Sequence, residues 1–379
     1  MKIEQAQWTA EKGWQPALAS KIPGDSIQVV FLFGNAKLVG RDGFLDDLRR
    51  AYPKARIFGC STAGEIQNTT VRDDTIALTA VGFEHTRMAA ARVRIEDPDR
   101  SFKAGEALAR QLPAAGLRHV FVLSEGLKVN ASELVNGINF ALPTGVTTSG
   151  GCAGDGNRLQ TTTVWCDGPP EESSAVALGF YGDRLQVGIS AIGGWKPFGP
   201  DRLITKSRQN ILYEIDNQPA LALYKEYLGK YAEGLPATGL MFPLELSIRN
   251  RQRVLRALLA VDEKEQSITF AGNVPEGAYA RFMVGHIEDL IEGTLVAARQ
   301  SMAGLNPGVP QFSILVSCNG RRFVLKQRIE EEVEAVREAL GQQAVLTGFY
   351  SYGEIAPPEG GGAAELHNET MTVTSFSET

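Results

Sequence analysis

The chain has 379 residues, of which 43% are hydrophobic and 22% charged, and its formal net charge is −6. This length exceeds what one hydrophobic core usually holds, so two domains are expected. The chain is mildly acidic and has no run of Lys or Arg longer than a pair. It therefore lacks the kind of basic face that binds nucleic acid or an anionic membrane.

The termini and the cysteines bear on the compartment. The N-terminal stretch MKIEQAQWTAEKGWQPALAS has no apolar segment of the kind a secretory signal needs, and no apolar run reaches the roughly eighteen residues of a membrane span. Cys60, Cys152, Cys166 and Cys318 are far apart and form no C-x-x-C pair. This spacing argues against a zinc site or a disulfide framework, and it favours the reducing cytoplasm.

Three segments of the chain are predicted to share one layout of strand, helix, strand, glycine turn and strand. Each begins with a short apolar, β-branched run that is typical of a buried strand, and each continues into helical spacing of apolar residues. The first has strands at 27–33, 55–58 and 73–83, a helix at 44–52 and the turn GCSTAGEI at 59–66. The second has strands at 119–123, 146–148 and 173–182, a helix at 131–142 and the turn SGGCAGDG at 149–156. The third has strands at 312–316, 344–349 and 368–376, a helix at 328–340 and the turn GFYSYGEI at 348–355.

The recurring turn indicates an internal repeat. Two copies fit G-x-x-[ST]-x-G-E-I, and the middle copy fits approximately, with Ser149 in place of the first glycine. Roughly thirty residues separate the first strand from the turn, which matches a βαβ-type unit. The alternative is that any α/β chain offers similar strand–helix–strand patterns, and the turns are the observation that favours the repeat.

A different region separates the second and third segments. GGWKPFGP at 193–200, rich in Gly and Pro, is a natural boundary. A strand at 210–215, a helix at 220–231, hairpins over 254–285 and a helix at 287–302 follow. We therefore predict an α/β (mixed α+β) fold with mixed sheets in two domains, residues 1–195 and 196–379. The first two segments would lie in the first domain and the third segment in the second.

The glycine turns are the candidate ligand site. Paired glycines flanked by hydroxyls expose backbone N–H groups that suit a small anion, whereas the acids Glu65, Asp155 and Glu354 suit an ammonium, a hydroxyl or an N–H of their own loop. The turns match neither a Walker loop nor a dinucleotide fingerprint. Tight structural turns with capping carboxylates are the open alternative. The candidate ligand-binding residues are Gly59, Cys60, Ser61, Thr62, Gly64, Glu65, Gly151, Cys152, Asp155, Tyr350, Ser351, Tyr352, Gly353, Glu354, His367 and Asn368.

Catalytic chemistry has a weaker basis in the sequence. Cys60 and Cys152 lie in corresponding turns, so a thiol nucleophile is one hypothesis, but no histidine has a local pattern that identifies it as the base. Small buried cysteines are the alternative interpretation. His367, which follows the glycine run at 360–362, is either a residue placed over the third turn or a solvated loop histidine. No catalytic or metal-ligating residue is predicted, and we expect that the chain is not an enzyme.

Several motifs together resemble one known family. GCSTAGEI after a strand, LYEIDNQPALALYKEYLG at 212–229, FPLEL at 242–246 and TGFYSYGEI followed by HNETMTVTSF are similar to blocks of the FIST sensory domain family. The resemblance covers nearly the whole chain, with an N-terminal FIST part over 1–195 and a C-terminal FIST part over 196–379.

The resemblance implies a sensory module that binds a small ligand, such as an amino acid, and signals through a separate output protein. A second implication is a haem-based nitric-oxide sensor that regulates a histidine kinase, although the chain has no C-x-x-C-H attachment motif. A thiol-dependent enzyme that uses Cys60 or Cys152 is a third hypothesis. Neither nucleic acid nor a membrane is expected as a partner.

Overall fold

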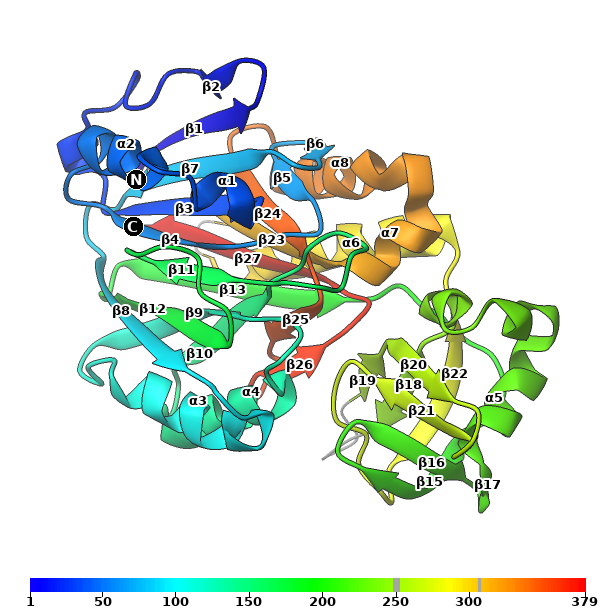
Figure 1. The fold of residues 1–379 in the computed structure, drawn as a ribbon. Coiled ribbons are helices and arrows are strands. Elements are labelled where there is room, and N and C mark those ends of the chain that lie inside the picture. The colour runs from blue at the N-terminus through cyan, green and yellow to red at the C-terminus, as the bar shows by residue number, and fades with distance from the viewer. Residues whose placement is uncertain (248–252, 306–307) are drawn as a thin grey trace.

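The computed structural model describes residues 1–247, 253–305 and 308–379. It consists of a large body of three sheets and a smaller lobe formed by residues 196–284, which lies to one side of the body (Figure 1). No helix within these residues combines the length and the apolar character that crossing a bilayer requires.

The first sheet of the body is built around the first predicted segment. Its strand order is β11-β4-β3-β7-β1-β2, with β3 and β4 parallel and β7 antiparallel to β3. The continuous apolar run of β3 is buried along its whole length, as expected for a central strand. Its strands are β1 (Lys2–Thr9), β2 (Gly13–Gln15), β3 (Val29–Gly34), β4 (Arg56–Cys60), β7 (Ile76–Gly82) and β11 (Val164–Cys166).

Each of the other two sheets of the body also contains a pair of parallel strands next to an antiparallel strand. The second sheet, β26-β25-β10-β9-β12-β8, contains β8 (Arg87–Arg94), β9 (Leu117–Ser124), β10 (Thr147–Cys152), β12 (Ser174–Tyr181), β25 (Gly353–Ala356) and β26 (Glu365–His367). The third, β13-β27-β23-β24-β5-β6, contains β5 (Glu65–Gln67), β6 (Thr70–Arg72), β13 (Leu185–Ile192), β23 (Phe312–Cys318), β24 (Val345–Ser351) and β27 (Met371–Glu378).

The chain that leaves each glycine turn crosses into a neighbouring sheet. After the first turn β5 pairs with β24, after the second turn β11 pairs with β4, and after the third turn β25 pairs with β10. Each sheet therefore receives a short strand from another segment. Strands β24 and β25 of the third segment, which was expected in the second domain, pair with β5 of the first segment and β10 of the second. The duplication behind the repeat and the boundary at residue 195 stay predictions.

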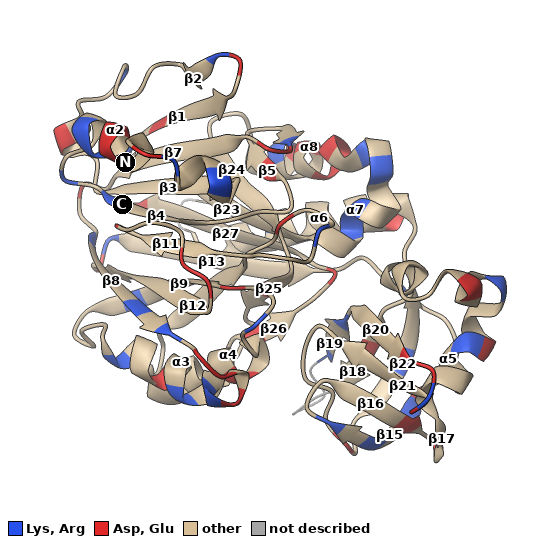
Figure 2. Cartoon of the chain, in the orientation of Figure 1, with Lys and Arg blue, Asp and Glu red and all other residues tan. Residues whose placement is uncertain are grey.

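Helices cover the outer faces of the sheets. α1 (Ala36–Val39) and α2 (Phe44–Ala51) pack on the first sheet, α3 (Ser101–Arg110) and α4 (Ala131–Ala141) on the second, and α6 (Ile287–Ser301) and α8 (Ile329–Leu340) on the third. The Asn130 side chain caps α4 by accepting a hydrogen bond from the Glu133 N–H. Charges of both signs are interleaved on these helices (Figure 2).

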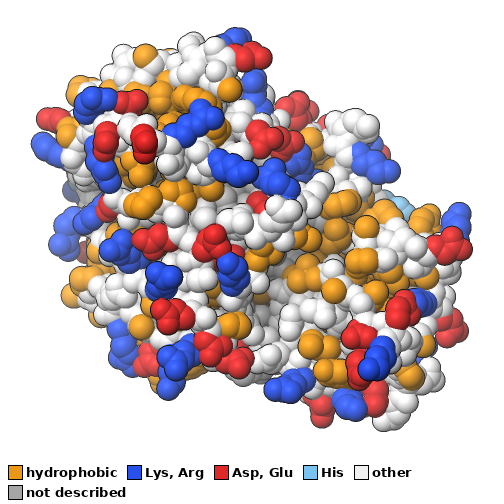
Figure 3. Space-filling model, viewed as in Figure 1, with side chains coloured by type: hydrophobic (Ala, Val, Ile, Leu, Met, Phe, Trp, Pro, Cys, Tyr) orange, Lys and Arg blue, Asp and Glu red, His pale blue; other side chains and the backbone are white. Residues whose placement is uncertain are grey.

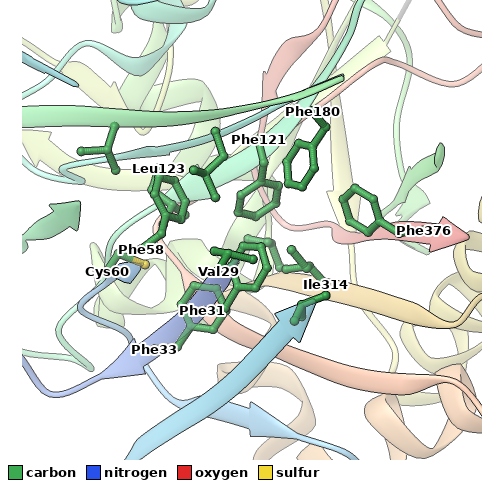
Figure 4. Packing of buried hydrophobic residues seen from close by; sticks show 14 of the residues in the cluster. Val29, Phe31, Phe33, Phe58, Cys60, Phe121, Leu123, Phe180, Ile314 and Phe376 are labelled. Carbon is green, nitrogen blue, oxygen red and sulfur yellow. The ribbon is translucent and has the colours of Figure 1, made fainter. Parts of the chain in front are cut away.

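The inner faces of the three sheets meet in one apolar core. Phe312 from the third sheet packs on Phe31 with ring centroids 5.5 Å apart. Phe31 and Phe58 from the first sheet and Phe121 from the second meet edge to face with ring centroids 6.2–6.4 Å apart (Figure 4). Edge-to-face contacts of this kind contribute beyond the area they bury. This core holds the ends of β4, β10 and β24, where the glycine turns begin, in fixed positions.

The lobe is a separate sheet with its own core. Its strand order is β19-β18-β22-β15-β16-β21-β20, with β14 beside β22 and β17 beside β16, and α5 packs against it. A short helix, α7 (Asn319–Leu325), lies on the body where the body faces the lobe. The lobe elements are β14 (Lys196–Pro197), β15 (Arg202–Arg208), β16 (Ile211–Ile215), β17 (Gln218–Pro219), α5 (Ala220–Leu228), η3 (Gly229–Gly234), η4 (Ala237–Met241), β18 (Leu244–Ser247), β19 (Arg253–Arg256), β20 (Leu258–Asp262), β21 (Ser267–Phe270) and β22 (Tyr279–Val284).

Candidate ligand cleft

The three glycine turns are hydrogen-bonded to one another. The Gly154 N–H in the second turn donates to the Ser61 carbonyl in the first at 2.9 Å. The Ala63 N–H donates to the Tyr350 carbonyl at 2.8 Å, and this joins the first turn to the third. The Tyr352 N–H completes the ring by donating to the Cys152 carbonyl at 3.2 Å. Turns that are almost three hundred residues apart in sequence therefore form one polar junction.

Close packing of neighbouring strands requires a glycine at the start of each turn. A Cβ added at Gly59, Gly150 or Gly348 would lie 1.7, 1.8 or 1.9 Å from a carbonyl oxygen of the parallel partner strand. Gly150, not Ser149, is therefore the counterpart of the other two, since it pairs with Val122 as Gly348 pairs with Leu315. The predicted match of Ser149 to the first glycine is therefore wrong by one residue, since Ser149 pairs with Phe121.

Glu65 and Glu354 close their turns with the same set of hydrogen bonds. One carboxylate oxygen accepts from a hydroxyl three residues earlier, Thr62 or Ser351, at 2.6 Å in both turns. The other oxygen accepts from both the N–H and the hydroxyl of one threonine. That threonine is Thr75 in the first turn and Thr370 in the third. The acids thus bond to their own part of the fold, as the alternative interpretation of the turns proposed.

Burial favours the neutral form of both acids. Desolvation raises the pKa of Glu65 to about 7, although the hydrogen bonds from Thr62 and Thr75 oppose it. Desolvation likewise raises the pKa of Glu354 to about 8 against the hydrogen bonds from Ser351 and Thr370. Each of the two carboxyl groups therefore gains or loses its proton near neutral pH.

Asp155 has a different role from the two glutamates. Its carboxylate accepts the backbone N–H groups of residues 159, 160 and 161 at 2.9–3.0 Å, together with the Tyr352 hydroxyl. Burial would raise the pKa of Asp155, but these hydrogen bonds outweigh burial and lower the pKa. Asp155 therefore holds the loop after the second turn against the third turn as an ionised acceptor.

The environments of Cys60 and Cys152 do not favour thiolate chemistry. Both side chains are buried, and desolvation raises the pKa of each thiol above its ordinary value. A nucleophilic cysteine needs the opposite shift and access to a substrate. The described geometry therefore supports the packing interpretation of these two residues.

A cleft of about 370 Å³ opens beside the turn junction, between the body and the lobe. Figure 3 shows hydrophobic side chains gathered along the hollow between these two parts. Its body wall consists of Gly126, Leu127, Asn157, Leu159, Cys318, Asn319, Gly320, Phe323, Ser351 and Tyr352. Its lobe wall consists of Pro236, Ala237, Leu240, Ala257, Leu258, Leu259 and Ala271.

Hydrogen bonds hold the lobe wall in place. The Arg256 guanidinium donates to the Leu366 carbonyl on the body at 2.8 Å. Asn273 bonds to the start of α4, with its N–H on the Ser132 hydroxyl at 3.1 Å and its Nδ2 on the Glu133 carboxylate at 2.8 Å. The cleft is therefore a preformed space, as most small-ligand sites are.

The predicted site residues are divided among several places. Ser351 and Tyr352 line the cleft, whereas Thr62, Gly64 and Glu65 line a second hollow of about 390 Å³. His367 lines a third one of about 320 Å³. Gly59, Cys60, Ser61, Gly151, Cys152, Asp155, Tyr350, Gly353, Glu354 and Asn368 line none of the described cavities. Their role in ligand binding stays a prediction.

Two family models match most of the chain. The FIST N domain model matches residues 28–218, and the FIST C domain model matches residues 220–357.

The chain belongs to the FIST family.

The two matches confirm the resemblance predicted from the sequence motifs. FIST domains are sensory domains implicated in signal transduction and ligand binding. No curated protein sequence matches this FIST chain.

Two solved structures align with nearly the full length of this FIST chain. One is a cyanuric acid hydrolase from A. caulinodans, with 8% identity, a TM-score of 0.39 and coverage of 100% of this chain and 98% of that chain. The other, also a cyanuric acid hydrolase, has 9% identity, a TM-score of 0.32 and coverage of 99% of both chains. The expectation that the chain is not an enzyme is contradicted by these hydrolase neighbours and is withdrawn. At such low scores the likeness assigns no activity to this chain.

Two of the four histidines of this FIST chain, His119 and His367, are buried and hydrogen-bonded within the fold, and haem binding stays a prediction. His119 is fully buried, with one ring nitrogen bonded to Thr147 and the other to Ser149. His367 shares a β-ladder position with Glu354, and its Nε2 bonds to the Ala356 carbonyl at 3.0 Å. Burial lowers the pKa of His367 to about 4. The hollow that His367 lines also exposes Arg253, Glu245 and Glu359, and such charges suit the faces of a porphyrin poorly.

Sequence reasoning missed most of the cleft. Leu127, Leu159 and Phe323 come from loops and a short helix that carry no recognisable motif. The lobe wall comes partly from 254–285, predicted only as hairpins, and partly from 236–240, where no element was predicted. Three leucines of the cleft share one structural signal, because Leu127, Leu159 and Leu259 are large hydrophobic residues with 37%, 55% and 45% of their surface exposed. Exposed leucines that gather at one hollow mark a binding surface.

Proposed function

We propose that this FIST protein senses a small molecule bound in the cleft between the body and the lobe. The observation that carries the proposal is the position of the cleft, where the third glycine turn, which is hydrogen-bonded to the other two turns, meets the apolar wall of the lobe. A molecule held there touches α7, the third turn and η4 at once. Binding therefore links the body to the lobe, which is what a sensor needs to convert occupancy into a change of shape.

The signal would pass to a separate output protein in the cytoplasm. The family resemblance suggests a histidine kinase as the class of partner and a small molecule as the ligand. A sensor of this kind changes the relative stability of two arrangements by the difference in its ligand's affinity for them. The lobe, joined to the body through residues 193–197 and 284–287, is the element whose position the ligand would bias.

A cleft-filling substitution tests the proposal. The first step is a thermal-shift screen of amino acids, organic acids, nucleotides, small aromatics and haemin, since a ligand at a hundredfold excess over its Kd stabilises the native state by about 2.7 kcal/mol. Ala237→Trp places an indole in the cleft, whereas Ala260→Trp adds the same group to a lobe strand outside it. We expect the same ligands to raise the Tm of wild type and of Ala260→Trp. We expect no rise in the Tm of Ala237→Trp.

Two results would overturn this assignment. One is the absence of any stabilising ligand in the screen. The other is a ligand whose thermal shift survives Ala237→Trp unchanged, because that ligand would bind outside the cleft. Circular dichroism of both variants shows whether the fold is kept.

A further inference from the structure

The described lining of the cleft contains no charged side chain. None of the residues of its two walls is Lys, Arg, His, Asp or Glu. Its ionisable members, Cys318 and Tyr352, have pKa values raised by burial, so both stay neutral at physiological pH. The neighbouring hollow shares Asn157 and Phe323 with the cleft and has the opposite character. Its charged residues are Glu65, Asp73, Asp74, Arg158, Arg322 and Lys326.

The two walls of the cleft supply different contacts. The lobe wall is apolar throughout, and Leu259 on it is 45% exposed. Leu127 and Leu159 on the body wall are exposed as well. A ligand with an apolar body would remove these leucines from water, and this is the main favourable contribution that such a surface offers.

Polar contacts are confined to the body wall. The Asn319 Nδ2 points to two oxygens, the Gly156 carbonyl at 3.3 Å and the Asn157 Oδ1 at 3.2 Å, and this fixes the orientation of the amide. The Asn319 Oδ1 is left without a hydrogen-bond partner in the described part of the chain, although Asn319 is only 8% exposed. A buried acceptor of this kind usually finds a donor. A ligand hydroxyl or amide N–H that reaches the Asn319 Oδ1 from the cleft would supply one.

We propose that the cleft selects an uncharged ligand with an aromatic or branched aliphatic body and one hydroxyl or amide N–H group that donates a hydrogen bond. This inference rests on the proposed function, because it names the ligand class of the same cleft. A carboxylate or ammonium would lose its hydration in the cleft without gaining a counter-charge, and that loss is costly. A zwitterionic amino acid, a nucleotide and the propionates of haem are disfavoured for this reason.

Matched pairs of probes test the preference for uncharged ligands, which we call the charge rule. Nile red, an uncharged dye, reports on the cleft by fluorescence, and competitors displace it. The pairs share a carbon skeleton and differ in charge: p-cresol against 4-hydroxybenzoate, and indole-3-acetamide against indole-3-acetate. We expect each neutral member to displace the dye at concentrations about tenfold or more below those of its charged partner. Equal or stronger displacement by the charged members overturns the inference.

A charge placed in the wall gives a second, independent test. Leu259→Asp puts a carboxylate in the lobe wall, and Tyr279→Asp puts one on the same lobe at an exposed position that does not line the cleft. We expect Leu259→Asp to weaken indole binding about tenfold or more and Tyr279→Asp to leave it unchanged. Equal effects of the two variants would overturn the inference.

Failure of the inference and failure of the proposed function give different results. If charged members bind to wild type and Ala237→Trp abolishes that binding, the cleft is the site and the charge rule is wrong. If neither the dye nor any competitor binds, or if all binding survives Ala237→Trp, the proposed function fails as well.

Discussion

Replacing Glu354 by Gln removes a titrating group from the third turn while the shape of its side chain is kept. In the folded protein burial raises the pKa of this carboxyl to about 8, and its ordinary value is 4.5. Between those two pH values the native state holds a proton that the unfolded chain releases. The stabilisation from this group is therefore complete below pH 4.5 and is lost as the pH rises through about 8.

The size of the effect follows from the two pKa values. Each pH unit between them is worth about 1.36 kcal/mol, so Glu354 accounts for a loss of about 5 kcal/mol across the window at most. Glu65, whose pKa burial raises to about 7, accounts for about 3 kcal/mol by the same reasoning. An unfolding entropy of about 2.1 cal/mol/K per residue converts these free energies into falls of roughly 6 °C and 4 °C in Tm for a chain of this length that unfolds as one unit.

The assay is thermal unfolding between pH 5 and pH 8.5 for wild type, Glu354→Gln and Glu65→Gln. Glu334→Gln, an exposed position on α8, is the matched control. We expect the Tm of wild type and of the control to fall with pH more steeply than the Tm of either turn variant. If Glu354→Gln keeps the wild-type slope, the carboxyl is not held protonated and the account of the turns is wrong.

Three further predictions follow from packing and burial. Replacing Gly59, Gly150 or Gly348 by Ala should lower the free energy of unfolding by about 1–3 kcal/mol or more, measured by denaturant unfolding. Gly168→Ala should leave it nearly unchanged, because the nearest atom to the added Cβ is 3.9 Å away. Glu332→Gln should destabilise the protein by about 3–5 kcal/mol, because Arg321 is fully buried against this carboxylate; equal midpoints for variant and wild type would contradict the role of the ion pair. The Cys60→Ala, Cys152→Ala double variant should keep ligand binding, and iodoacetamide should label these two thiols of the wild type only after unfolding; labelling of the native protein would restore the thiol hypothesis.

The sequence predicted what local patterns encode. The apolar run of β3 and the amphipathic pattern of α8 required only periodicity, and both lie within a residue or two of the predicted bounds. The turn motif likewise carried its own chemistry, since a hydroxyl three residues before the glutamate reaches the carboxylate within one turn.

The exchange of strands between sheets could not be predicted from the sequence. β5 and β11 are three residues long, and nothing in such short stretches indicates which sheet they join. Pairing between β25 and β10 connects positions about two hundred residues apart and depends on the central aromatic core. Non-local contacts of this kind leave no local trace in a single sequence.

The cleft was missed for a related reason. Tyr352 was identified because it lies in a motif, whereas Leu127 and Leu259 come from unrelated segments and become neighbours only when the lobe is placed beside the body. The turn acids were identified because carboxylates are chemically conspicuous, yet Glu354 bonds to its own turn and lines none of the described cavities. A conspicuous residue type is therefore a weaker guide to a ligand site than the surface around it.

Photo-crosslinking locates the ligand most directly. An uncharged aryl diazirine that carries a hydroxymethyl group is irradiated with the native protein, and labelled peptides are identified by mass spectrometry with and without excess indole. The account predicts label that indole competes away on peptides containing Leu259 and Phe323, one from each wall of the cleft. Competed label beside Glu65 or His367 instead, or label that indole does not reduce, would contradict the claim that the cleft is the sensory site.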